Sequence, residues 1–208
     1  MKERLLRTLL IAFFCCSFIS VFAQKFGGGI TFGGVSSQVA GDRHSGFKKA
    51  GVTGGFYVNL EIGNHSLLQM ELTFMQKGSR YNMSDDAVVS DDENPPYLLR
   101  LSYISLPLIY QYQMKRFMFE GGLNVDFLVG HYEEISFEEN TLDDWRFINF
   151  ATVFGIRYFI TERVSVGLRT INSINSIRKH AVEGNVKRYS NKYGAFNDVL
   201  QFSVFYTL

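Results

Sequence analysis

The sequence predicts an all-β fold, an eight-stranded antiparallel up-and-down transmembrane β-barrel after a cleaved signal peptide. Three observations lead to this prediction. Apolar and polar residues alternate with a period of two in eight segments after residue 25, which is typical of strands with one apolar face. The connections between these segments alternate between long and short. A hydrophobic export signal comes first, and the final segment is apolar up to Leu208.

The beginning of the chain has the features of a signal peptide. Three positive residues precede an uncharged, apolar run over residues 8–22, and Ala23 offers a small residue for cleavage. We therefore expect residues 1–23 to be a signal peptide and residues 24–208 to form one barrel domain. An uncleaved anchor is the alternative, but the apolar run is short compared with the ~20 residues of a membrane-spanning helix.

The composition of the expected mature chain excludes several classes of function. Both cysteines lie in the signal segment, so the exported protein can form no disulfide. Loss of that segment takes Lys+Arg from 21 to 18 and Asp+Glu from 20 to 19, which leaves a net charge of −1. A chain without a basic excess gives no indication of nucleic-acid binding. Many aromatic residues and only 3 prolines are typical of lipid-facing strands.

The first four strands are predicted from their alternation. They cover residues 26–36, 49–62, 67–80 and 97–113. In the first strand Phe26 and Phe32 share a face with glycines, whereas Glu61 and Glu71 lie on the polar faces of the second and third strands. The fourth strand is apolar on both faces, so the pattern does not settle which face is which. Pro107 has no amide proton to donate, and it predicts a bulge or a local defect in that strand.

The last four strands are predicted in the same way. They cover residues 117–132, 145–160, 163–172 and 198–208. The fifth strand has the clearest alternation, with Glu120 and Asp126 opposite an apolar face. Arg157 and Arg169 lie on the polar faces of the sixth and seventh strands. The eighth strand has an apolar residue at every second position up to Leu208.

The connection lengths predict which end of the barrel faces outward. The long connections cover residues 37–48, 81–96, 133–144 and 173–197, and the short ones lie near residues 64, 115 and 162. Outer-membrane barrels have short periplasmic turns and long outer loops. An even number of strands then places both chain ends on the periplasmic side. A soluble secreted barrel is the alternative, because its polar face would be solvated exterior and periodicity alone does not distinguish the two.

Three local motifs carry a family resemblance. They are the glycine-rich residues 26–29, the Tyr-Ile-Ser-Leu-Pro-Leu strand within residues 101–110, and Gly-Gly-Leu at residues 121–123. With them the chain resembles the porin-like outer-membrane β-barrel family of small exported barrels. The resemblance implies an outer-membrane location in a Gram-negative bacterium, with a possible pore or a role in secretion or adhesion, and it transfers no catalytic residue. Many such barrels end in Phe; this chain ends in Tyr-Thr-Leu, an apolar end still suited to the barrel-assembly machinery.

Charged residues of both signs are predicted to face the lumen. They are Glu61, Glu71, Lys77, Glu120, Asp126, Arg157 and Arg169. The interior of an eight-stranded barrel is just wide enough for side chains, and buried charges are tolerated when they are paired. We therefore expect an ion-pair network that fills the lumen. A narrow polar channel lined by the same residues is the alternative, because glycines at 122, 155 and 167 leave room for water.

The predicted outer loops have opposite charges. The second and third loops are acidic, and the first and fourth are basic. The candidate interaction surface consists of Asp85, Asp86, Asp91, Asp92, Glu93, Glu138, Glu139, Arg178, Lys179, Lys187 and Arg188. Its basic side would meet lipopolysaccharide phosphates, and its acidic side would meet divalent cations or a basic partner. Ordinary solvated loops are the alternative.

No residue pattern predicts a catalytic, cofactor or metal site. The four histidines have no metal-ligand spacing. We expect a non-enzymatic protein of envelope structure or surface interaction, and a narrow porin for small solutes or ions is the alternative. A third possibility is a rim enzyme acting on lipid, with His131, Ser136 and Glu133 or Glu134. The expected partners are outer-membrane lipid, lipopolysaccharide, the barrel-assembly machinery, and an extracellular or envelope protein.

Overall fold

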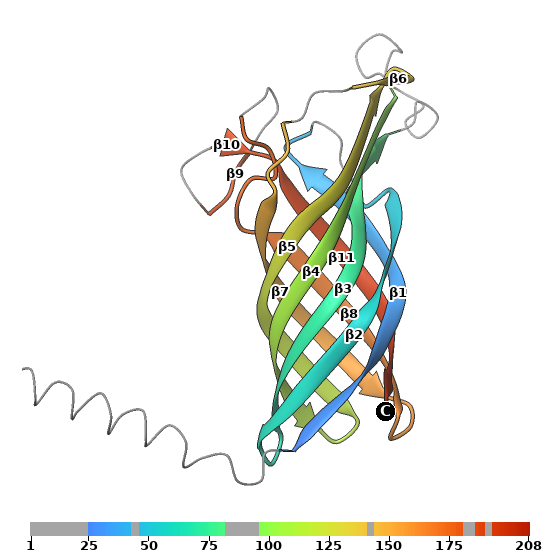
Figure 1. Ribbon diagram of the computed structural model, residues 1–208, viewed down its shortest axis with the longest axis vertical. Coiled ribbons are helices and arrows are strands. Elements are labelled where there is room, and N and C mark those ends of the chain that lie inside the picture. Colours follow the sequence, from blue (N-terminus) through green and yellow to red (C-terminus); the bar gives the residue numbers. More distant parts are fainter. Residues whose placement is uncertain (1–24, 43–45, 82–95, 141–143, 181–185, 190–192) are drawn as a thin grey trace, which may run out of the picture.

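The computed structural model describes residues 25–42, 46–81, 96–140, 144–180, 186–189 and 193–208. The predicted signal peptide lies outside these residues. The described chain forms a closed antiparallel β-barrel (Figure 1). Within the described residues no helix is long and apolar enough to cross a membrane.

Eight long strands build the barrel wall. They are β1 (Phe26–Ala40), β2 (Lys49–Gly63), β3 (Ser66–Tyr81), β4 (Tyr97–Met114), β5 (Phe117–Ile135), β7 (Ile148–Phe159), β8 (Val164–Ser173) and β11 (Phe196–Thr207). The strand order is β4-β3-β2-β1-β11-β8-β7-β5, and a further pairing of β4 with β5 closes the circle. Three short strands lie in the loops, β6 (Glu138–Glu139), β9 (Val186–Lys187) and β10 (Tyr193–Gly194). The predicted eight-stranded up-and-down barrel is thus confirmed.

The first and last long strands form the seam. β1 pairs antiparallel with β11 from Gly29–Thr207 to Ala40–Phe196 without a shift in register. A closed barrel leaves no unpaired edge strand, so each wall strand has a hydrogen-bonding neighbour on both sides. The turns β2–β3, β4–β5 and β7–β8 lie at one end, which we call the turn end, and the long connections lie at the other, which we call the loop end (Figure 1).

The outer face of the wall is apolar. Exposed side chains include Phe26 (71%), Phe32 (60%) and Leu123 (60%), and similar residues recur on every wall strand. Buried positions, by contrast, include many polar and charged side chains. A soluble barrel has the reverse arrangement, because a continuous apolar exterior is unfavourable in water. The distribution therefore fits a barrel whose outside meets lipid.

The interior also contains apolar layers that the sequence pattern did not predict. One cluster lies toward the loop end and includes Leu99, Leu101, Tyr103, Trp145 and Ile177. A second cluster draws residues from six of the wall strands; it consists of Val35, Met75, Ile109, Ala151, Val153, Ile171 and Val199. β4 contributes to both clusters, which explains why its sequence is apolar on both faces.

The irregularity expected at Pro107 takes a different form. The register of β4 against β5 shifts between Ser102 and Tyr103, so the bulge lies closer to the loop end than predicted. At Pro107 the pairs of β4 with β3 stop at Met70–Leu108 and resume at Thr73–Ser105, with unchanged register. Proline lacks the N–H that this ladder would use. The ladder is therefore interrupted there without the extra residue that a bulge inserts.

Candidate functional site

A buried ion network crosses the barrel lumen. It joins Glu71 of β3, Glu120 of β5, Arg157 of β7 and Arg169 of β8. Arg169 Nη2 lies 2.8 Å from Glu71 Oε1, and Arg169 Nε lies 2.5 Å from Glu120 Oε2. Arg157 Nη2 lies 2.7 Å from Glu120 Oε1. Two carboxylates thus balance two guanidinium groups, which is the condition for keeping such charges out of water.

Glutamine and aromatic side chains complete this network. Gln69 Nε2 donates to Glu71 at 2.5 Å, and Gln111 Nε2 donates to Glu120 at 2.8 Å. The ring of Phe205, on the last strand, lies 3.5 Å from Arg157 Cζ and 4.9 Å from Arg169 Cζ, measured to the ring centroid. Such contacts favour a desolvated cation. The network therefore has further partners on β3, β4 and β11.

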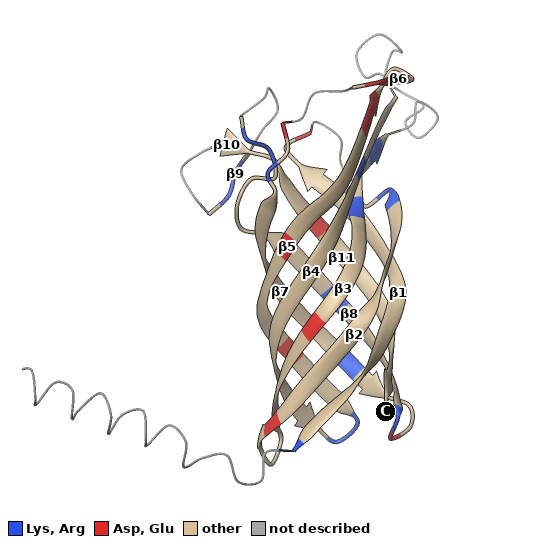
Figure 2. Ribbon diagram, viewed as in Figure 1, with Lys and Arg blue, Asp and Glu red and all other residues tan. Residues whose placement is uncertain are grey.

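A second ion pair lies in the lumen beside the first network. Lys77 Nζ is 2.6 Å from Asp126 Oδ2, and both side chains are almost completely buried. Ser105 Oγ and Asn124 Nδ2 donate to Asp126 Oδ1 at 2.5 and 2.8 Å. The Lys77 ammonium also lies 5.2 Å from the ring centroid of Tyr103. Figure 2 shows charged positions on the strands midway along the barrel, where its wall is otherwise uncharged.

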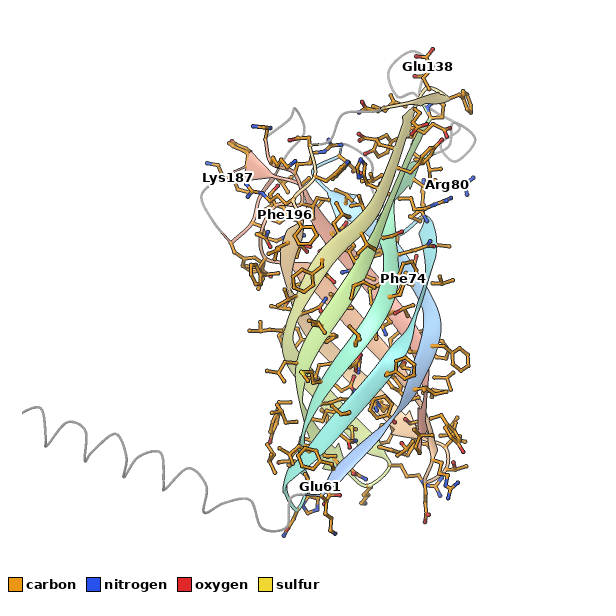
Figure 3. The ribbon with its side chains drawn as sticks, in the orientation of Figure 1. Glu61, Phe74, Arg80, Glu138, Lys187 and Phe196 are labelled. Carbon is orange, nitrogen blue, oxygen red and sulfur yellow. The ribbon has the colours of Figure 1, made fainter. Side chains whose placement is uncertain are left out.

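Glu61, the seventh residue of the predicted lumen set, is not joined to the other six. It lies near the turn end of β2 (Figure 3), and its side chain is 53% exposed. Its nearest described cation is Lys25, at 4.0 Å. The pairing of β2 with β3 becomes irregular between Glu61 and Gly63, where the strand leaves the barrel. The alternation of residues specifies a face, but it does not specify depth along the barrel axis.

A polar cluster ties the loops together at the loop end. Glu133 of β5 is buried and accepts hydrogen bonds from Tyr97 Oη at 2.8 Å, from Asn140 Nδ2 at 2.7 Å and from Arg178 Nη2. The Arg178 guanidinium lies 4.1 Å from the ring of the buried Trp145. Trp145 and Arg178 also form a β-bridge. The connections after β5 and after β8 are thereby held to each other above the lumen.

This arrangement changes the expected charge pattern of the rim. The sequence places acidic Glu133 and basic Arg178 in different loops, and the structure pairs them. Arg188 likewise pairs with Asp198, with Nη1 at 2.7 Å from Oδ1. Hydrogen bonding to Asp198 raises the pKa of the Arg188 guanidinium. Two basic residues of the candidate interaction surface therefore form ion pairs within the protein.

The remaining residues of that surface differ in position. Glu138 and Glu139 are exposed on β6, which pairs with the outer end of β5 at the loop end (Figure 1). Lys179 and Lys187 are exposed in the connection between β8 and β11. The five acidic residues of the second loop, Asp85, Asp86, Asp91, Asp92 and Glu93, lie outside the described residues. The acidic and basic groups that are described belong to different loops around the rim (Figure 2).

In the described part of the chain, no hydrogen bond or ion pair joins His131 to Ser136, Glu133 or Glu134, the residues considered for a rim enzyme. Glu133 binds Tyr97, Asn140 and Arg178, and Glu134 accepts a hydrogen bond from Tyr132 at 2.7 Å. His131 is exposed at the outer part of β5. Among the described residues no group of three His, Cys, Asp or Glu side chains could hold a metal ion.

The fold and its inverted polarity define a membrane-embedded β-barrel. Residues 21–179 match the family model described as outer membrane protein beta-barrel domain. The chain therefore belongs to the outer membrane protein beta-barrel domain family, and it is a protein of the Gram-negative outer membrane. The turn end is accordingly the periplasmic end, and the loop end is the extracellular end. No curated protein matches the chain by sequence.

Solved structures share this fold at low sequence identity. Neisserial surface protein A is 10% identical with a TM-score of 0.54, and the match covers 89% of this chain and 99% of that one. Ail, the attachment invasion locus protein of Yersinia pestis, is 11% identical with a TM-score of 0.51, covering 88% of this chain and 99% of that one. Ail has also been solved in complex with the heparin analogue sucrose octasulfate, and that structure gives a TM-score of 0.50 at 10% identity, covering 88% and 99%.

Proposed function

We propose that this protein is a non-enzymatic, non-conducting outer-membrane barrel that acts in envelope structure or surface interaction through its extracellular loops. The observation that carries the proposal is the filled lumen. Two buried ion clusters, built on Arg169 and on Lys77, occupy its middle. An apolar layer and the Glu133–Arg178 pair lie above them. With the lumen occupied, the exposed loops are the part of the protein that partners can reach.

The expected partners follow from this arrangement. The apolar exterior would contact outer-membrane lipid, and the rim would contact lipopolysaccharide. The barrel-assembly machinery would insert the chain, and an extracellular or envelope protein would bind the loops. Acidic Glu138 and Glu139 are exposed on β6 at the loop end, which suits a basic partner.

Single-channel recording tests the non-conducting barrel. The refolded protein is added to a planar bilayer, after a heat-dependent gel shift has shown that the barrel is folded. We expect no openings, because the ion clusters block the lumen. Reproducible openings from folded protein would contradict the proposal. Exchange of the extracellular loops for those of an unrelated eight-stranded barrel tests the proposed surface interaction. The exchange should abolish the surface phenotype while the heat-dependent gel shift persists.

A narrow channel is the second candidate function, and two observations favour it. A cavity of about 680 Å³ opens at the periplasmic end and reaches the buried Arg157. Several buried polar atoms have no hydrogen-bond partner among the described residues, including Arg157 Nε, Gln111 Oε1, Asn124 Oδ1 and Gln201 Oε1. Such atoms would line a hydrated path. If a channel exists, Arg157→Gln should change its conductance or ion selectivity.

A further inference from the structure

A pocket lies at the extracellular end of the barrel, and it plays no part in the proposed filling of the lumen. It has a volume of about 760 Å³ and lies between the connection after β5 and the connection from β8 to β11. Its lining includes Arg146, Lys179, His180, Tyr189 and Tyr193. Pockets of this size accommodate ligands of several hundred daltons. Figure 3 shows side chains gathered around Lys187 and Phe196 in this region, at the loop end of the barrel.

The charged side chains among the described lining residues of this pocket are basic. Its described lining residues include Arg146, Arg178 and Lys179 and no carboxylate. Among the described acids, Asp144 Oδ1 lies 2.8 Å from His180 Nδ1. Glu133 pairs with Arg178 and balances its charge, so Arg146 is the lining cation on which the inference rests. A site of this kind attracts anions and disfavours cations.

Arg146 is held in a geometry suited to receiving an anion. Its Nε donates to the carbonyl oxygen of Arg178 at 3.0 Å, and its Nη2 donates to that of Lys179 at 3.5 Å. These bonds to the backbone leave its positive charge without a carboxylate partner among the described residues. They also leave the Nη1 donors for another acceptor, since a guanidinium has five N–H groups. A sulfate, phosphate or carboxylate would satisfy them with short, charge-assisted hydrogen bonds.

Two tyrosines give the pocket an aromatic surface. Tyr189 is 65% exposed and Tyr193 is 59% exposed, although both are large rings. The Lys187 ammonium lies 4.8 Å from the Tyr193 ring centroid, which places a further positive charge beside this ring. An exposed tyrosine offers an apolar face and a hydroxyl group together. A sugar ring, with C–H groups on one face and hydroxyl groups at its edge, complements such a surface.

We propose that this pocket binds an anionic oligosaccharide. The cations select the sulfate, phosphate or carboxylate groups, and the tyrosines receive the sugar rings. The inference rests on the proposed surface-interaction function and names its ligand class. The same chemistry occurs in the phosphorylated core of lipopolysaccharide and in sulfated polysaccharides from outside the cell, so the experiment uses one probe from each source.

Calorimetric titration of the refolded barrel in detergent tests the proposal. The probes are a heparin-derived tetrasaccharide, the lipid-free core oligosaccharide of lipopolysaccharide, and neutral maltotetraose. We expect binding of at least one anionic probe, weakened by added salt, and no binding of maltotetraose. The preferred anionic probe identifies the source of the natural ligand. Equal binding of the neutral and anionic sugars, or no binding of either anionic probe, would overturn the inference.

Variants locate the binding in this pocket. Arg146→Gln should weaken the affinity for the anionic probe by about tenfold or more, through loss of a charge-assisted contact. Tyr193→Ala should also weaken it, whereas Tyr193→Phe keeps the ring and should retain most of the affinity. Lys115→Gln, which removes an exposed cation from a periplasmic turn, is the matched control. Wild-type affinity in both Arg146→Gln and Tyr193→Ala would refute this site.

The oligosaccharide inference and the proposed surface function can fail independently of each other. If no anionic sugar binds but loop exchange still abolishes the surface phenotype, the surface function stands and the oligosaccharide inference fails. If the sugar binds and loop exchange leaves the phenotype intact, the pocket exists and the surface function is wrong. The heat-dependent gel shift shows for each variant that the barrel has folded.

Discussion

Replacement of Glu120 by Gln is the most direct test of the buried network. The side chain is fully buried and lies between two guanidinium groups, 2.7 Å from Arg157 and 2.5 Å from Arg169. The substitution keeps the shape of the side chain and removes its charge. Arg169 keeps Glu71 at 2.8 Å, but Arg157 loses the carboxylate to which it is bonded. An uncompensated buried charge then remains.

The expected loss of stability is large. Removal of one partner from a buried ion pair costs about 3–5 kcal/mol, and the retained hydrogen-bonding amide places Glu120→Gln near the lower value. A loss of about 3 kcal/mol corresponds to a roughly 100-fold change in the folding equilibrium. The matched control is Glu61→Gln, which changes the same group where it is half exposed and 4.0 Å from Lys25. Exposed pairs of this kind contribute at most about 1 kcal/mol.

Urea titration of the barrel in lipid vesicles measures the difference. The migration of unheated samples on a gel reports the folded fraction, and the fluorescence of Trp145, the single tryptophan, gives a second signal. The midpoint for Glu120→Gln should fall well below that of the wild-type protein, and Glu61→Gln should stay close to it. Coinciding midpoints for the two variants would show that the lumen charges are hydrated, and the reasoning from burial would be refuted.

Two further predictions concern the wall and the loops. A Cβ on Gly122 would lie 2.2 Å from a backbone oxygen of β4, so Gly122→Ala should destabilise the barrel by about 1–3 kcal/mol in the same urea titration. Gly121→Ala, whose Cβ would have its nearest neighbour at 3.8 Å, should change stability by less than about 0.5 kcal/mol, and equal effects would contradict the packing. Glu133→Ala removes the acceptor that binds the two outer connections, so Trp145 should become more accessible to acrylamide quenching. Glu134→Ala should leave quenching unchanged. Increased quenching in both variants would contradict a specific role of Glu133 in holding the two connections together.

The wall of the barrel could be predicted from the sequence because its signals are local. A period of two identifies a strand and its faces, and connection lengths identify the two ends, so six of the seven proposed lumen charges lie inside the wall. The depth of a residue along the barrel axis could not be predicted, because the alternation is the same at the middle of a strand and at its end. Glu61 therefore has the expected phase but lies at the turn end, half exposed.

Features that depend on distant partners could not be predicted in the same way. The bulge at Ser102 is a property of how β4 pairs with β5, and a single strand does not reveal it. The pair of Glu133 with Arg178 joins residues 45 positions apart, one on β5 and one in the connection that follows β8. The inward apolar layer did leave a signal, since the fourth predicted strand is apolar on both faces. This pattern arises because apolar side chains, as well as ion pairs, can fill a narrow lumen.

The distribution of the ion network over the wall has a consequence for membrane insertion. Its four charged residues come from β3, β5, β7 and β8, and the ring that covers the arginines comes from the last strand. A slip of one residue in any of these strands would turn its charge toward lipid, at a cost of about 2–4 kcal/mol for an arginine at the bilayer midplane. Full neutralisation is reached only when all of these strands are in register and the seam between β1 and β11 has closed. The network thus selects the native register during insertion and disfavours misaligned barrels.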